Sequence, residues 1–177
     1  ISPGGTSSTA AGPSGSSAMI DTLTSGSVTM TRTAPTLDNL DIGALTIMGN
    51  SPGSDPIMGE NWDTDGISVS GCGYKVHGTT VTTDYVAGSC SNSASPNMIT
   101  LGDVDATYTG TMNAVYARNS VITLGEGSVS MPSSYDKMSK ASTNGKIILI
   151  DIDQDGTDCL SASDCDVSSS SSGVIYF

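Results

Sequence analysis

Apolar and polar residues alternate with a period of two along most of this chain. The alternating runs are Ser27–Met30, Leu37–Met48, Gly66–Ser70, Tyr74–Tyr85, Met98–Tyr108, Ala114–Ala117, Ser120–Met131, Lys146–Asp153 and Gly173–Phe177. They are rich in Val, Ile, Thr and Tyr and end at Gly, Asn, Asp or Ser, a pattern typical of half-buried β-strands. We therefore expect an all-β fold of about nine to twelve strands. The one stretch compatible with a helical turn is Ser133–Ser142.

One pentapeptide occurs twice in these runs. Residues Ile99–Asp103 read ITLGD and residues Ile122–Glu126 read ITLGE. Self-similarity at a spacing of roughly 20–50 residues is typical of stacked supersecondary units. We therefore favour a parallel β-helix (solenoid), in which Ile99 stacks on Ile122 and Leu101 on Leu124. Asn119, Gly125 and Gly127 suit the corners of such a coil, where left-handed backbone is needed.

A β-sandwich is the alternative architecture, because its strands also alternate and its turns also recur every roughly 8–12 residues. A sandwich gives no reason for the repeated pentapeptide. In either case we expect a single all-β domain over residues 18–177. Residues 1–17 are rich in Ser, Gly and Pro, which favours a flexible N-terminal tail or a donor segment for another subunit.

Acidic residues dominate the charge of the chain. There are 18 Asp and Glu against 6 Lys and Arg, and the formal net charge is −12. No basic patch can be assembled from so few cations, which argues against binding to nucleic acid or to anionic membrane surfaces. Cations are the natural partners of such a surface. No apolar run approaches the roughly 18 residues of a transmembrane helix.

The four cysteines favour disulfide bonds. Pairing between neighbours, Cys72 with Cys90 and Cys159 with Cys165, closes two short loops, although four cysteines allow three pairings. A zinc site is the alternative, but the spacing lacks C-x2-C, and the single histidine is His77. Disulfides indicate an oxidising setting, so we expect an extracellular or cell-surface protein.

An acidic loop near the C-terminus carries a candidate Ca²⁺ site. Its acidic residues alternate with other residues and precede Gly156, a spacing that lets a curled loop direct several carboxylates to one centre. The loop resembles the calcium loops of EF-hands, dockerins and thrombospondin-type repeats. It departs from the EF-hand at position 12, which is Ala162 and not Glu. Asp164 and Asp166 would supply the late ligands instead. The predicted ligands are Asp151, Asp153, Asp155, Asp158 and Asp164. The alternative is a solvated acidic turn.

A second acidic cluster surrounds the single tryptophan, Trp62. Its members are Asp55, Glu60, Asp63 and Asp65. Carboxylates beside an aromatic ring occur in sugar-binding and glycosidase clefts, so a carbohydrate-binding module or a Ca²⁺-dependent β-helix lyase is the alternative function. A polar loop with Trp62 as a partly buried anchor explains the cluster more simply. No G-x-S-x-G motif accompanies His77, and we expect no enzyme activity.

The last residues form a short apolar strand after a run of serines. Its residues are Gly173, Val174, Ile175, Tyr176 and Phe177. Such a strand closes the domain's own sheet or adds to the open edge of another subunit. An edge-to-edge contact that does not close produces a filament. We therefore expect this segment to take part in assembly, with copies of the same chain as partners.

The stretch Asn97–Met131 resembles the repeats of autotransporter-type adhesin passengers and related surface β-helix proteins. The matching pieces are Ile99–Gly102, Val104–Tyr108, Ala114–Ala117 and Ile122–Gly125. The resemblance implies a right-handed β-helix in a secreted adhesive or structural protein, with surface glycans as further partners. Four cysteines are unusual for such passengers, and residues 51–97 fit the repeat poorly. We expect an extracellular structural protein: a subunit or segment of a filament, sheath or adhesin.

Overall fold

The computed structural model describes residues 36–48, 56–132 and 134–177 in full. Earlier in the chain it describes the strands β1 (Ser7–Ala10), β2 (Met19–Ile20), β3 (Leu23–Thr24) and β4 (Ser27–Met30). All regular structure in these parts is β. Within the same ranges no helix is long and apolar enough to cross a membrane.

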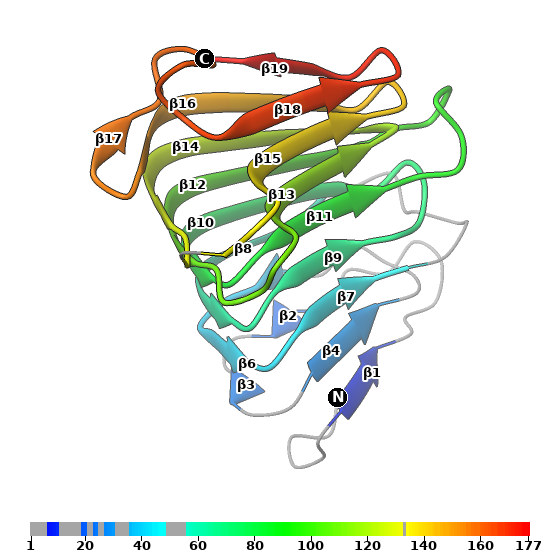
Figure 1. The fold of residues 1–177 in the computed structure, drawn as a ribbon. Helices are drawn as coiled ribbons and strands as arrows, with labels where there is room; N and C mark the ends of the chain where they lie inside the picture. The colour runs from blue at the N-terminus through cyan, green and yellow to red at the C-terminus, as the bar shows by residue number, and fades with distance from the viewer. Residues whose placement is uncertain are drawn as a thin grey trace.

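Two parallel sheets face each other and form a β-solenoid (Figure 1). Sheet A contains β1, β4, β7 (Leu45–Ile47), β9 (Ile67–Val69), β11 (Val86–Ser89), β13 (Asn113–Arg118), β15 (Lys137–Ser142) and β18 (Val167–Ser170). Sheet B contains β2, β3, β5 (Thr36–Leu37), β6 (Leu40–Ile42), β8 (Ile57–Thr64), β10 (Lys75–Thr83), β12 (Asn97–Thr107), β14 (Ser120–Ser130), β16 (Lys146–Gln154), β17 (Thr157–Asp158) and β19 (Val174–Tyr176). The chain alternates between the sheets. From β8 to β15, each circuit adds one strand to sheet B and one strand to sheet A.

The repeated pentapeptide sets the register between β12 and β14. Ile99 pairs with Ile122 and Leu101 with Leu124, so the predicted stacking is confirmed. The isoleucine column runs through the whole interior of sheet B and consists of Ile57, Val76, Ile99, Ile122, Ile147 and Ile175. Stacking of like aliphatic side chains buries a continuous core that no single coil could form alone. The β-helix is therefore the fold, and the sandwich alternative is excluded.

A second interior column is completed by the tryptophan. Leu101, Leu124 and Leu149 stack in register, but the equivalent positions in β10 and β8 are Gly78 and Gly59. The Trp62 indole occupies this space: a Cβ added to Gly78 would lie 2.7 Å from Trp62 Cζ3, and one added to Gly59 2.8 Å from Trp62 Nε1. The glycines thus make room for one large side chain in place of two leucines.

Sheet B bends at one residue per coil that has left-handed backbone. These residues are Asn39, Asn61, Thr80, Asp103, Glu126 and Asp151, with φ between 48° and 57°. Side chains with short polar groups tolerate this region better than branched apolar ones. The predicted corner at Asn119 is confirmed by its φ of 44°. Gly125 and Gly127 were the wrong residues, because the positive φ falls on Glu126 between them.

Three further expectations need correction. The stretch 133–142 forms no helical turn among its described residues, because Lys137–Ser142 is strand β15 and pairs in parallel with β13. Residues 56–97 join the solenoid fully, although their sequence fits the repeat poorly: β8 and β10 stack in register with β12. The number of strands is also larger than expected, because short strands such as β2, β3, β11, β17 and β18 lie outside the alternating runs.

Most of the predicted tail at residues 1–17 lies outside the described residues. The part that is described, Ser7–Ala10, is strand β1 and pairs with β4 in parallel. The division of the chain into a tail and a single domain over 18–177 stays a prediction.

Candidate functional site

Two columns of polar side chains follow the bend on the outer face of sheet B. The first consists of the six left-handed residues of the bend, which the register places one above another. The second lies two residues further along each strand and consists of Asp41, Asp63, Thr82, Asp105, Ser128 and Asp153. Buried residues alternate with them, for example Val104 between Asp103 and Asp105. Parallel strands are about 4.8 Å apart, so successive members of each column are close neighbours.

An open, shallow recess lies between the two columns toward the C-terminal end. It is lined by Asp103, Val104, Asp105, Glu126, Gly127, Ser128, Asp151 and Asp153. The backbone approaches closely here, because a Cβ on Gly127 would lie 1.9 Å from the Val104 carbonyl oxygen. Ser128 Oγ donates to Asp105 Oδ1 at 3.3 Å. The recess therefore concentrates five carboxylates on a rigid sheet and presents an acidic surface.

The structure separates the five predicted calcium ligands. Asp151 and Asp153 line the recess. Asp155 Oδ1 accepts a hydrogen bond from the Met131 amide at 2.9 Å, and Asp158 pairs with Asp153 across β16 and β17. Among the described residues, no group of three or more His, Cys, Asp or Glu side chains is arranged to hold a metal ion. Calcium binding therefore stays a prediction.

The last of the five predicted ligands is engaged locally. Asp164 Oδ2 accepts a hydrogen bond from Ser161 Oγ at 2.8 Å, and Asp164 Oδ1 lies 3.5 Å from Ser163 Oγ. Gly156, the glycine of the predicted loop, has a φ of 83°, and its amide donates to Asp153 Oδ1 at 3.2 Å. The sharp turn that the motif predicted is thus present.

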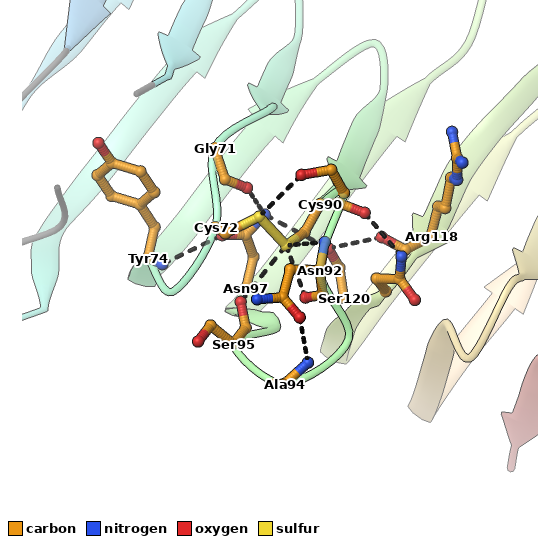
Figure 2. The surroundings of a disulfide bond; sticks show 12 residues. Gly71, Cys72, Tyr74, Cys90, Asn92, Ala94, Ser95, Asn97, Arg118 and Ser120 are labelled. Carbon is orange, nitrogen blue, oxygen red and sulfur yellow. Dashed lines mark hydrogen bonds between the residues drawn. A yellow bond between two sulfur atoms is a disulfide. The ribbon is translucent and has the colours of Figure 1, made fainter. Parts of the chain in front are cut away.

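The two cysteine pairs lie at disulfide distance in the predicted pairing. Cys72–Cys90 joins consecutive coils with a Cα–Cα distance of 5.0 Å (Figure 2). Beside it, the buried Asn97 receives a hydrogen bond from the Tyr74 amide at 3.1 Å and donates one to the Gly71 carbonyl at 2.6 Å. Burial also raises the pKa of the Tyr74 hydroxyl. The disulfide and Asn97 together fix the corner at the start of β12.

Cys159–Cys165 closes a short loop over the C-terminal end of the core. Both cysteines are buried and belong to the hydrophobic core, and their Cα atoms are 5.4 Å apart. The Cys159 amide donates to the Ile152 carbonyl at 2.8 Å. This loop therefore covers the end of the aliphatic columns at the bent half of sheet B.

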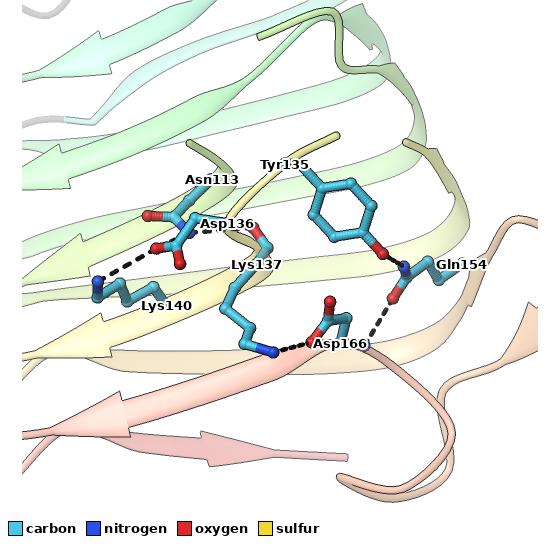
Figure 3. Close-up of polar contacts among 7 residues, drawn as sticks. All are labelled: Asn113, Tyr135, Asp136, Lys137, Lys140, Gln154 and Asp166. Carbon is cyan, nitrogen blue, oxygen red and sulfur yellow. Dashed lines mark hydrogen bonds and ion pairs between the residues drawn. The ribbon is translucent and has the colours of Figure 1, made fainter. Parts of the chain in front are cut away.

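Polar contacts tie the same loop to the neighbouring coil (Figure 3). The Asp166 amide donates to Gln154 Oε1 at 2.7 Å, and Gln154 Nε2 donates to Tyr135 Oη at 3.0 Å. The Asp166 carboxylate forms an ion pair with Lys137. The hydrogen bond and the charge of Asp166 raise the pKa of the Lys137 amine.

The Trp62 side chain of the acidic cluster points into the core, and carbohydrate binding stays a prediction. Trp62 is only 1% exposed, so its ring cannot stack on a ligand at the surface. Glu60, Asp63 and Asp65 are exposed, and Asp55 lies outside the described residues. The predicted polar loop is wrong for Glu60 and Asp63, because both lie in strand β8, and Trp62 is fully and not partly buried.

His77 and the C-terminal segment lie at different places on sheet B. His77 is exposed on the outer face, with Met58 and Thr100 as its neighbours in register. Residues 174–176 form β19, which pairs with β16. Three of the segment's side chains, Val174, Tyr176 and Phe177, are exposed. No pattern in the sequence marks the methionines near His77, because only the register between coils places them there.

The chain matches no known protein-family model, no curated protein and no solved structure. The β-helix implied by the likeness of Asn97–Met131 to adhesin passengers is present. The adhesin family itself stays a prediction.

Proposed function

We propose that this chain is an extracellular structural protein, a subunit or segment of a cell-surface filament, sheath or adhesin, whose copies join end to end. The observation that carries the proposal is that the strands at both ends of the solenoid have an unpaired edge. Among the described residues, β18 pairs only with β15, β19 only with β16, and β1 only with β4. Each therefore has one edge whose backbone groups lack a partner strand, and such edges favour pairing with another chain.

Both ends of the solenoid suit the same kind of contact. The strands along each sheet are parallel apart from the small β17, so a second copy translated along the axis would continue sheet A from β18 to its own β1. This contact joins different surfaces of the two copies and does not close on itself, which is the geometry of a filament. The exposed apolar side chains of Val174, Tyr176 and Phe177 would be buried by it.

The cysteines support a location outside the cell. Two pairs at disulfide distance are typical of proteins that fold in an oxidising compartment and are rare in the cytosol. Disulfides between short-range partners would also hold the coils together under mechanical load. We also propose surface glycans as adhesive partners. This part of the proposal is based on the resemblance of Asn97–Met131 to adhesin passengers.

Calcium is the proposed ion of the acidic loop. Five aspartates, Asp151, Asp153, Asp155, Asp158 and Asp164, carry the required oxygen ligands, and binding would draw their side chains together from their present hydrogen bonds. We expect Ca²⁺ to raise the melting temperature of the native chain and to have a smaller effect on Asp158→Asn. Asp41→Asn, which changes an exposed aspartate far along the solenoid, is the control. An equal response of all three proteins to Ca²⁺ would remove calcium from the proposal.

Assembly is tested by sedimentation and negative-stain electron microscopy of the purified chain. With a net charge of −12, copies repel one another, so we expect polymers to form more readily as salt screens this repulsion. The Val174 amide bonds to the Gly145 carbonyl, so the alternation of a parallel strand places the Ile175 amide on the free edge. Ile175→Pro removes this donor. Ile175→Ala loses similar packing but keeps the donor and is the matched control.

The expected result is regular polymers of the native chain and of Ile175→Ala, and monomers of Ile175→Pro. Native protein that stays monomeric at every salt and protein concentration would overturn the filament. Polymers of Ile175→Pro identical to those of the native chain would show that assembly does not use this edge.

A further inference from the structure

The single histidine lies between two exposed methionines on the flat half of sheet B. Met58 in β8 is the register neighbour of His77 in β10. Met98 in β12 pairs with Lys75, two residues before His77 on the same strand. Because residues i and i+2 share a face, the three side chains of Met58, His77 and Met98 all project from the outer face of sheet B.

These three residues are close enough for their side chains to bind one ion together. Neighbouring parallel strands lie about 4.8 Å apart and each residue advances the chain by about 3.3 Å, which places His77 Cα about 5 Å from Met58 and about 8 Å from Met98. The two methionines are on opposite sides of the histidine. Methionine has three rotatable side-chain bonds and an extended reach, so both sulfur atoms can approach the imidazole ring.

Both methionines are exposed to solvent beside the histidine. Met58 is 47% exposed and Met98 is 41% exposed. Neither takes part in the core, and His77 is exposed beside them. The neighbouring side chains on this face include Thr100, in register with His77, and Thr79, two residues further along β10, and both are small. Solvent and ions can therefore reach all three side chains.

We propose that Met58, His77 and Met98 form a binding site for a soft monovalent metal ion, Cu(I). Thioether sulfur is a soft ligand that selects Cu(I), and imidazole nitrogen also suits copper. Two sulfur atoms and one nitrogen make a three-coordinate site. All four cysteines are paired in disulfides, so no thiolate of this chain competes for the ion. Lys75, which lies beside Met98, opposes the charge of the ion and limits the affinity.

Anaerobic competition of the native chain with a coloured Cu(I) chelator tests the site. We expect one Cu(I) per chain. His77→Gln should weaken binding at least tenfold, and Met58→Leu and Met98→Leu should each weaken it severalfold. Met112→Leu is the matched control, because Met112 is 68% exposed and lies elsewhere, beyond the end of β12. These side chains are exposed and the replacements conserve size, so we expect all four variants to fold, as circular dichroism would verify.

A second measurement needs no variant. Ag(I) has the same soft ligand preference and no redox chemistry under these conditions, so it can be added to the protein labelled with ¹³C at the methionine methyl groups. We expect the methyl signals of Met58 and Met98 and the ring signals of His77 to shift together, saturating at one equivalent. Shifts spread over all exposed methionines, or equal Cu(I) affinity of His77→Gln, Met58→Leu and Met112→Leu, would overturn the proposal.

Discussion

The indole nitrogen of Trp62 donates a 2.7 Å hydrogen bond to the carbonyl oxygen of Leu37 in the preceding coil. Both residues are buried. The bond therefore links two coils through the interior, at the place where Gly59 and Gly78 interrupt the leucine column. One side chain both fills the space left by two glycines and satisfies a main-chain oxygen that water cannot reach.

Trp62→Phe is expected to lower the free energy of unfolding by about 2–4 kcal/mol, since it leaves the Leu37 oxygen without this donor and opens a cavity above Gly59. Urea denaturation followed by circular dichroism measures the change. Tyr176→Phe, at an exposed aromatic residue, is the control and should change stability by less than about 0.5 kcal/mol. A loss as small as that of the control would mean that the tryptophan does not support the N-terminal coils.

Ser139→Val is expected to stabilise the protein by about 1 kcal/mol. The Ser139 hydroxyl is fully buried and has no hydrogen-bond partner. Its neighbours in register are Val115 and Val167, so valine extends an aliphatic column. Ser142→Val is the matched control in the same strand, because the Ser142 hydroxyl bonds to Tyr116 Oη at 3.0 Å. A melting temperature that falls for Ser139→Val would contradict the assignment of this hydroxyl as unpartnered.

The two disulfides are expected to differ in their effect on stability. Replacing Cys72 and Cys90 by alanine should cost about 3 kcal/mol, and replacing Cys159 and Cys165 about 2 kcal/mol from loop entropy, because the second pair closes the shorter loop. The second pair also covers the core, so its loss should speed hydrogen exchange in β16. Exchange that accelerates equally throughout the solenoid would show that the Cys159–Cys165 loop is not a local cap.

The pKa of the Asp136 carboxyl is expected to rise toward its ordinary value in Lys140→Met. Hydrogen bonds from Lys140 and Asn113, together with the charge of Lys140, hold this pKa below its ordinary value. A carboxyl whose pKa is lower in the folded state stabilises the protein above its unfolded pKa, and this contribution is lost as the pH falls through the folded pKa. The Lys140–Asp136 contact should therefore open only in acid below the ordinary carboxyl range. A ¹³C NMR titration measures the pKa of the Asp136 carboxyl, and Lys75→Met is the control. An Asp136 titration curve that is unchanged in Lys140→Met would contradict the prediction.

Local patterns were enough to predict the class of fold and its central register. The alternation of Ile99, Leu101, Ile122 and Leu124 is a property of each strand alone, and its repetition places like residues one above another. The disulfide pairing was also accessible, because each pair closes a short loop. The bend at Asn119 followed from the tolerance of asparagine for left-handed backbone. In these cases the determining interactions lie within a coil or between identical segments.

The relationships between unlike coils were decided only by the tertiary structure. Residues 56–97 stack on β12 without sharing its sequence, because backbone hydrogen bonds between parallel strands accept any side chain. Loops of differing length separate the strands, so the register that brings Met58 beside His77 cannot be counted along the chain. The calcium motif shows the same limit. Its spacing predicted converging carboxylates, whereas β16 and β17 place Asp158 beside Asp153, and separate hydrogen bonds engage Asp155 and Asp164. The sequence by itself determined a stacked β-fold with polar corners, and packing between coils determined which side chains meet on its surface.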